Sequence, residues 1–276
     1  MNPPTVTPPR LLADGLRFPE GPAFAPDGSL WCVELQGAGL VRWCAGAMTR
    51  YATGGAPNGA AVDAQGRIWF CDAQHHAIRR LDARSGEIET LASEVDGHPL
   101  NKPNDLAFDR AGNLVFTCPG DSRQEPTGYV CCLLKDGTVR KIATGLYFPN
   151  GLAFTADGTG LVIAETYRQR LWRGTWNDAT CEWCEPTVWA EGLHGAPGPD
   201  GMAFAADGTL WVAVYGSGGL VRVNAAGGVI DHHPAGGLNP TNCAFDPAGL
   251  LGLVVTEAEH GNLWSHSGIG PGILLF

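Results

Sequence analysis

One phrase returns six times along the chain: a Pro, a polar residue, a short apolar stretch, an Asp-Gly-like turn and a second apolar stretch. The copies begin at Pro19, Pro57, Pro103, Pro149, Pro199 and Pro240, at intervals of 38 to 50 residues. Intervals of this size are typical of the four-stranded blade of a β-propeller. Gly in the turn supplies the positive φ that a tight β-hairpin needs. We therefore predict an all-β fold, a six-bladed β-propeller.

The six copies use nearly the whole chain of 276 residues, so we predict one domain over residues 1–276. A short phrase ends the outer strand of the middle blades, as at residues 142–146, and it also occurs at residues 12–16, before the first hairpin. We expect this N-terminal strand, near residues 10–16, to complete the last blade. The strand would then join the two ends of the chain and remove a free sheet edge.

The residue directly after each Pro differs from copy to copy. In order, these residues are Glu20, Asn58, Asn104, Asn150, Asp200 and Thr241. A closed ring brings equivalent positions of its blades to one mouth of the channel, so these side chains should converge. Carboxylates at short range raise each other's pKa or are neutralised by a cation, and an all-oxygen ligand set suits a hard divalent ion.

Asn and Asp after Pro are also ordinary turn residues, because they tolerate unusual backbone angles and bond to their own backbone. Asn58 and Thr241 are assigned to that role. Glu has no such turn preference, although the copy that contains Glu20 is otherwise built like the rest. Turn chemistry therefore does not explain Glu20.

Four of these motifs together resemble the family of senescence marker protein 30, gluconolactonase and luciferin-regenerating enzyme. The motifs are Phe-Pro-Glu-Gly-Pro at residues 18–22, Asn-Lys-Pro-Asn-Asp at 101–105, Phe-Pro-Asn-Gly at 148–151 and Gly-Pro-Asp-Gly at 198–201. The resemblance covers the chain from Phe18 to about Trp264. It implies a six-bladed propeller with metal ligands at Glu20, Asn150 and Asp200, and with Asn104 beside the metal and the substrate.

The same resemblance implies metal-dependent hydrolysis of a lactone or a related ester. Asp200 would be the general base as well as a ligand, and Asn104 and Lys102 would bind the substrate. The family often has Arg where this chain has Lys102. Calcium is the expected ion, with magnesium, manganese, zinc or iron(II) as alternatives. His98 and His194, each six residues before a channel residue, are further substrate-binding candidates, against the alternative of loop histidines that face solvent.

Charge and composition restrict the partners and the compartment. The net charge is −10 with only 18 basic residues, which argues against nucleic-acid binding and favours a neutral lactone or ester. Because no apolar stretch has membrane-spanning length and no signal-peptide pattern begins the chain, we expect a cytoplasmic protein that does not bind membranes. The nine cysteines are an odd number, and several fall in apolar strand patterns, so reduced thiols are expected. No motif indicates an oligomeric state.

Two other functions are compatible with a propeller. One is a metal-independent enzyme that resembles strictosidine synthase, which the combination of Glu20, Asn150 and Asp200 disfavours. The other is a non-catalytic binding module of the NHL or WD40 type, in which the polar channel residues only satisfy one another. Such modules usually present basic, aromatic or hydrophobic patches on their loops.

Overall fold

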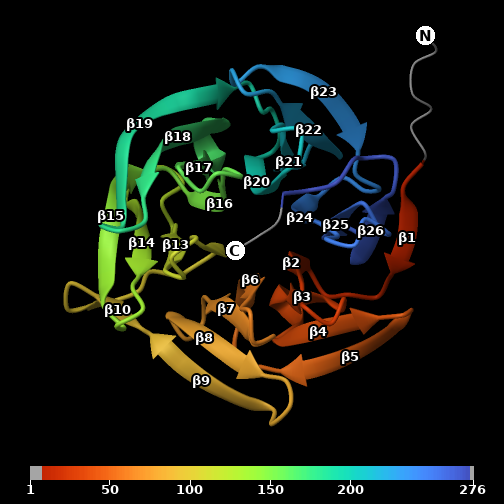
Figure 1. Cartoon of the computed structure of the whole chain (residues 1–276), viewed down its shortest axis with the longest axis horizontal. Helices are drawn as coiled ribbons and strands as arrows, with labels where there is room; N and C mark the ends of the chain where they lie inside the picture. The colour runs from red at the N-terminus through yellow and green to blue at the C-terminus, as the bar shows by residue number, and fades with distance from the viewer. Residues whose placement is uncertain (1–7, 274–276) are drawn as a thin grey trace.

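The computed structural model describes residues 8–273, which form a six-bladed β-propeller (Figure 1). The predicted all-β fold is thus confirmed. Each blade is a four-stranded antiparallel sheet whose first strand lies next to the central channel and whose fourth strand lies at the rim. The residue after each Pro therefore lies at the channel end of its blade.

The first three blades follow one another along the chain. Blade 1 contains β2 (Pro19–Phe24), β3 (Leu30–Glu34), β4 (Gly39–Cys44) and β5 (Ala47–Ala52). Blade 2 contains β6 (Pro57–Val62), β7 (Ile68–Asp72), β8 (Ala77–Asp82) and β9 (Glu87–Ala92). Blade 3 contains β12 (Leu106–Phe108), β13 (Leu114–Cys118), β14 (Gly128–Leu133) and β15 (Val139–Leu146).

The last three blades complete the ring. Blade 4 contains β16 (Pro149–Phe154), β17 (Gly160–Glu165), β18 (Arg170–Asn177) and β19 (Glu182–Glu191). Blade 5 contains β20 (Gly198–Phe204), β21 (Leu210–Tyr215), β22 (Gly219–Val223) and β23 (Val229–Pro234). Blade 6 contains β24 (Pro240–Phe245), β25 (Leu253–Glu257), β26 (Asn262–His266) and β1 (Arg10–Ala13). Outside the blades lie a hairpin of β10 (Glu94–Val95) and β11 (His98–Pro99) and the 3-10 turns η1 (Leu35–Gly37) and η2 (Thr166–Arg168).

An N-terminal strand closes the ring. The register of β1 against β26 pairs Arg10 with Ser265 and Leu11 with Trp264. Just beyond β1, the backbone N–H of Leu16 donates to the carbonyl of Gly261 at 2.9 Å, and the Leu16 side chain is buried between blades 6 and 1. The outermost parts of the domain predicted from the sequence, residues 1–7 and 274–276, lie outside the described residues.

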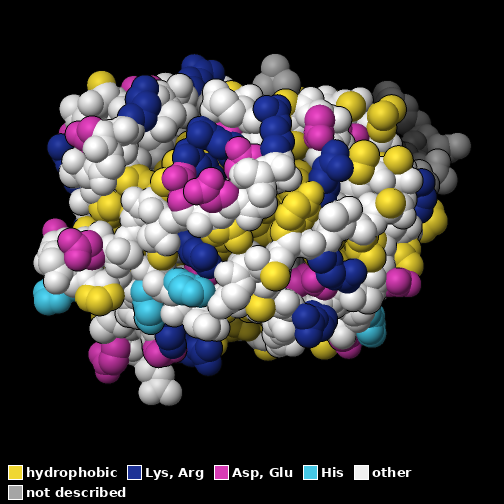
Figure 2. All heavy atoms as spheres, turned by 90° about the horizontal axis from the view of Figure 1, so that it is seen from below, with side chains coloured by type: hydrophobic (Ala, Val, Ile, Leu, Met, Phe, Trp, Pro, Cys, Tyr) yellow, Lys and Arg dark blue, Asp and Glu magenta, His cyan; other side chains and the backbone are white. Residues whose placement is uncertain are grey.

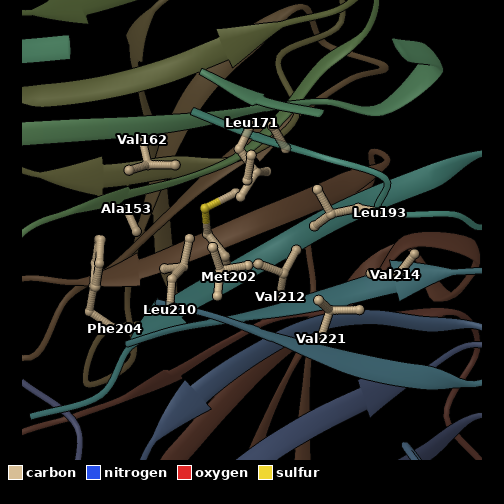
Figure 3. Packing of buried hydrophobic residues seen from close by; sticks show 13 residues of the cluster. Ala153, Val162, Leu171, Leu193, Met202, Phe204, Leu210, Val212, Val214 and Val221 are labelled. Atoms are coloured by element: carbon tan, nitrogen blue, oxygen red, sulfur yellow. The ribbon is translucent and has the colours of Figure 1, made fainter. Parts of the chain in front are cut away.

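The hydrophobic core is divided among the seams between blades, because each sheet must bury both of its faces against its neighbours. Figure 3 shows the seam between blades 4 and 5, where side chains of β16, β17 and β18 pack against those of β20, β21 and β22. The residues include Ala153, Val162 and Leu171 from blade 4 and Met202, Leu210, Val212 and Val221 from blade 5. Separate apolar clusters fill the other five seams.

Four buried carboxylates at the ends of second strands hold the loops that lead into the channel. The carboxylate of Glu34 accepts a hydrogen bond from the backbone N–H of Arg17, and that of Glu165 accepts one from Tyr147. Asp72 and Glu257 accept equivalent bonds from the N–H groups of Ala56 and Asn239. Each bond fixes a backbone N–H within one or two residues of the Pro that begins an inner strand. This anchoring positions the residues that follow the Pro.

Other features concern the thiols and the surface. All nine cysteines lie among the described residues as free thiols, and seven of them are buried. On the side of the ring shown in Figure 2, Lys and Arg side chains are interspersed with Asp and Glu. Within residues 8–273, no helix has the length and apolar character needed to cross a membrane.

Candidate active site

The polar residues that follow Pro gather at one end of the channel. Glu20, Asn150 and Asp200 each lie at the second or third position of an inner strand, and all three are buried. Asn104, also buried, comes just before the shorter inner strand β12. Asn58 is half-buried in β6, and Thr241 is buried in β24.

A break in strand register turns these residues towards the channel. In blades 1, 2, 4, 5 and 6, the pairing of the first strand with the second shifts directly after the Pro or after the polar residue. Such bulges bend a strand and redirect a side chain away from the regular alternation. In this fold, they let consecutive residues of an inner strand face the channel end.

The residue directly after each of these polar residues determines how closely neighbouring blades approach. It is Gly in four blades, at residues 21, 59, 151 and 201. A Cβ atom at any of these glycines would collide with the inner strand of the following blade. The two exceptions are Asp105 in blade 3 and Asn242 in blade 6, and both side chains are buried. The Asp105 carboxylate occupies the space that a Cβ atom on residue 59 would need. The Asn242 amide occupies the corresponding space beside Gly201.

Asp105 and Asn242 meet across the channel. Nδ2 of Asn242 donates a hydrogen bond to Oδ2 of Asp105 at 3.2 Å, and the Asn242 amide also hydrogen-bonds to the carboxylate of Glu20. Backbone N–H groups fix the carboxylates further: Gly21 donates to Oε2 of Glu20, and Leu106 donates to Oδ1 of Asp105, both at 2.9 Å. Sequence reasoning missed these two residues. The signal that would have found them is a polar side chain where the other four repeats have Gly.

Three carboxylates share this buried space and disfavour each other's charge. Burial and then the charge of Asp105 raise the pKa of Glu20 to about 8. Burial raises the pKa of Asp105 to about 6, against hydrogen bonds from Leu106 and Asn242 that lower it. The pKa of Asp200 is well above its ordinary value, because of burial and then the charges of Glu20 and Asp105, although a hydrogen bond from Asn150 lowers it. The channel end is thus a buried acidic site.

This donor set fits a hard divalent cation. Glu20, Asp105 and Asp200 offer carboxylate oxygens, Asn104 and Asn150 offer amide oxygens, and such cations prefer oxygen ligands. A cation would also remove the electrostatic penalty that raises the three pKa values. Among residues 8–273, no three His, Cys, Asp or Glu side chains come together as a metal site by themselves. An ion here would therefore need the Asn side chains as ligands beside the carboxylates.

The remaining predicted site residues lie outside the buried cluster. Lys102 is exposed, and its Nζ forms an ion pair with Asp121 at 2.9 Å. His194 is also exposed, with Nδ1 at 3.0 Å from Oε1 of Gln169, and His98 is an exposed residue of β11. The structure thus brings Glu20, Asn150 and Asp200 together in the channel and places Lys102, His98 and His194 on the surrounding loops.

The fold and the site define a six-bladed propeller with a buried acidic channel end. The model of the SMP-30/gluconolactonase/LRE-like family matches residues 18–259, and the chain belongs to that family. Diisopropyl-fluorophosphatase of Loligo vulgaris is 28% identical over 260 residues, which cover 87% of this chain and 80% of that protein. A pentonolactonase of Haloferax volcanii is 27% identical over 258 residues, 92% of this chain and 85% of that protein. A solved gluconolactonase of Xanthomonas campestris superposes with a TM-score of 0.83 at 29% identity, over 94% of this chain and 89% of that one.

Proposed function

We propose that the protein is a divalent-metal-dependent lactonase that opens a lactone or a related cyclic ester at the channel end. The observation that carries this proposal is the convergence of Glu20, Asn150 and Asp200 in one buried acidic site. Membership of the SMP-30/gluconolactonase/LRE-like family and similarity to two lactonases support the same reaction. Other cyclic esters fit the site equally well, because its buried part recognises a carbonyl and a water.

Glu20, Asn150 and Asp200 are proposed to hold the ion, and Asn104 lies beside it. When bound, the cation supplies a Lewis acid for the lactone carbonyl and lowers the pKa of a water molecule. Calcium is the preferred ion because every donor is oxygen and the set includes neutral amides. Magnesium, manganese, zinc and iron(II) are the alternatives. Asp105 is held by Asn242 and contributes charge to the site.

Asp200 is proposed as the general base that takes the proton of the attacking water. Its carboxylate is fixed by hydrogen bonds from Asn150 and from the backbone N–H of Gly201, so its position is set before the substrate enters. The side-chain amide of Asn104 would donate to the oxyanion that develops on the carbonyl oxygen. Lys102, His98 and His194 are proposed to contact the part of the substrate outside the channel, where they would affect KM more than kcat.

A lactone panel tests the function. EDTA-treated protein would be assayed by pH-stat on aldonolactones and simple lactones, with calcium, magnesium, manganese, zinc and iron(II) added back singly. Hydrolysis restored by one of these ions is the expected result. A failure of every ion on every lactone would overturn the proposal and favour a strictosidine-synthase-like enzyme or a binding propeller.

Hydrolysis of a phosphoryl fluoride, in which water replaces fluoride at phosphorus, is a second candidate, favoured by the similarity to diisopropyl-fluorophosphatase over 87% of the chain. The same buried carboxylates would serve a phosphoryl centre as well as a carbonyl. Fluoride release from diisopropyl fluorophosphate, followed with an ion-selective electrode, separates the two activities. A rate above that on every lactone would make hydrolysis of the P–F bond the main reaction.

A further inference from the structure

The mouth above the acidic site has an aromatic side that the channel chemistry does not use. Phe18 and Phe148 directly precede the prolines that begin β2 and β16, two residues before the proposed ligands Glu20 and Asn150. Both have positive φ, 57° and 58°, a backbone shape that is uncommon for a residue with a side chain. Lys102, the equivalent residue of blade 3, shares this shape with φ 49°, and its side chain is exposed.

Each Phe belongs to an aromatic pair. The rings of Phe18 and Tyr215 are stacked with centroids 6.3 Å apart, so this contact reaches from blade 1 to blade 5 past the narrow end of blade 6. Burial and then the charges of Asp200, Glu257 and Glu20 raise the pKa of Tyr215. Phe148 packs against Tyr167 of η2 with centroids 5.4 Å apart.

Arg123 joins the second pair from the loop of blade 3. Its guanidinium carbon lies 5.8 Å from the ring centroids of both Phe148 and Tyr167. The four rings are half-buried, and Arg123 is exposed. The mouth therefore has an aromatic arc on blades 4, 5 and 1 and a charged arc on blade 3, formed by Arg123 and the pair of Lys102 with Asp121.

From this arrangement we infer that the preferred substrate is a lactone that carries an aryl substituent, instead of a polyhydroxylated sugar lactone. The inference rests on the proposed lactonase function and names its substrate class. An aryl ring that packs on one of these pairs, Phe18 with Tyr215 or Phe148 with Tyr167, buries apolar area and makes offset ring contacts. The hydroxyl groups of a sugar lactone need hydrogen-bond partners, and the two Phe rings offer none.

Three five-membered lactones test this preference in calcium-loaded protein. They are γ-butyrolactone, γ-phenyl-γ-butyrolactone and ribono-γ-lactone, which differ only in their substituents. We expect kcat/KM for the phenyl lactone to exceed both others by about tenfold or more, the discrimination typical of one hydrophobic group. In Phe148→Ala and Phe18→Ala, the ratio of kcat/KM for the phenyl lactone to that for γ-butyrolactone should fall about fivefold or more, mainly through KM.

Trp189→Leu is the matched control, because Trp189 also pairs with an arginine, Arg173 at 5.2 Å, but lies on the outer strand β19. This variant should keep the wild-type ratio. If γ-butyrolactone is hydrolysed and the phenyl group brings no advantage, or if ribono-γ-lactone is the best substrate, the inference fails and the lactonase function stands. If no lactone is hydrolysed, the proposed function fails and the inference falls with it. The kcat/KM values of the wild-type protein on the three lactones test the preference for an aryl lactone even where an alanine variant does not fold.

Discussion

Asn242 of blade 6 donates a hydrogen bond of 3.2 Å to Asp105 of blade 3, the blade on the opposite side of the ring. The two side chains fit here because Gly59 and Gly201 have no Cβ atom to occupy the places of the Asp105 carboxylate and the Asn242 amide. The same Asn242 amide hydrogen-bonds to Glu20. One neutral side chain thus positions two of the three buried carboxylates.

Asn242→Ala should lower the free energy of unfolding by roughly 1–3 kcal/mol, since it leaves the buried Asp105 carboxylate without its amide donor. Urea unfolding followed by tryptophan fluorescence would measure the change. Asn58→Ala, at a half-buried residue of blade 2, should stay within about 0.5 kcal/mol of the wild type. Equal losses in the free energy of unfolding in the two variants would show that the hydrogen bond across the channel does not stabilise the protein measurably.

Gly201→Ala should disturb the site sterically, because the new Cβ would occupy the place of the Asn242 amide. A destabilisation of about 1–3 kcal/mol is expected for an overpacked position, together with weaker calcium binding in a titration. Gly270→Ala is the matched control, since a Cβ there meets nothing within 4 Å. A Gly201→Ala protein with wild-type stability and calcium affinity would contradict the packing seen in the channel.

Asp200→Asn should lower kcat by about a hundredfold or more on any lactone the protein hydrolyses, because the amide cannot accept the proton of the attacking water. The substitution preserves size, so circular dichroism and the melting temperature should show a folded protein. Asn58→Ala should stay within about threefold of the wild-type rate, since Asn58 is assigned to a turn. Comparable losses in both variants would remove the assignment of Asp200 as the base.

Calcium should stabilise the protein more as the pH rises from 5.5 to 8. Without metal, the pKa of Glu20 is about 8 against an ordinary 4.5, so the folded state binds a proton that the unfolded state lacks. That contribution to stability is complete below pH 4.5 and is lost as the pH rises through 8. The cation takes the place of the proton.

At 100 times its Kd, calcium adds about 2.7 kcal/mol to the free energy of unfolding. Thermal melts with EDTA or calcium would show a difference in melting temperature that widens with pH. In Glu20→Gln this difference should widen less, because only the raised pKa values of Asp105 and Asp200 remain. A difference that is independent of pH in the wild type would contradict this linkage.

His266 should weaken the fold in acid. Burial, with a smaller effect of His233, lowers its pKa to about 4 from 6.5, and its buried Nε2 has no hydrogen-bond partner among residues 8–273. The stabilising contribution of the neutral ring is complete above pH 6.5 and is lost as the pH falls towards 4, by about 3 kcal/mol at most. His266→Phe should flatten the stability profile in this window, whereas His232→Gln, at an exposed residue, should leave it unchanged. An unaltered profile in His266→Phe would exclude this residue as a source of acid sensitivity.

The repeat in the sequence predicted the blades and the register of the channel residues. The number of copies set the number of blades, and the position after each Pro gave six candidate residues. The family resemblance selected Glu20, Asn150 and Asp200 among them, and the structure places these three together. Sequence reasoning missed Asp105 and Asn242, although both occupy the repeat position that is Gly in the other four blades. Their contact exists only when blades 3 and 6 face each other.

The sequence by itself determined the all-β propeller, because it follows from a local phrase that every blade repeats, and the acidic character of the channel, because some copies carry a carboxylate where the phrase meets the channel. Only the tertiary structure decided which side chains share the channel end, since closure of the ring brings residues 137 positions apart into hydrogen-bond contact. It also decided the character of the mouth. The stacking of Phe18 on Tyr215 and the pairing of Lys102 with Asp121 depend on loop geometry, which no repeat encodes.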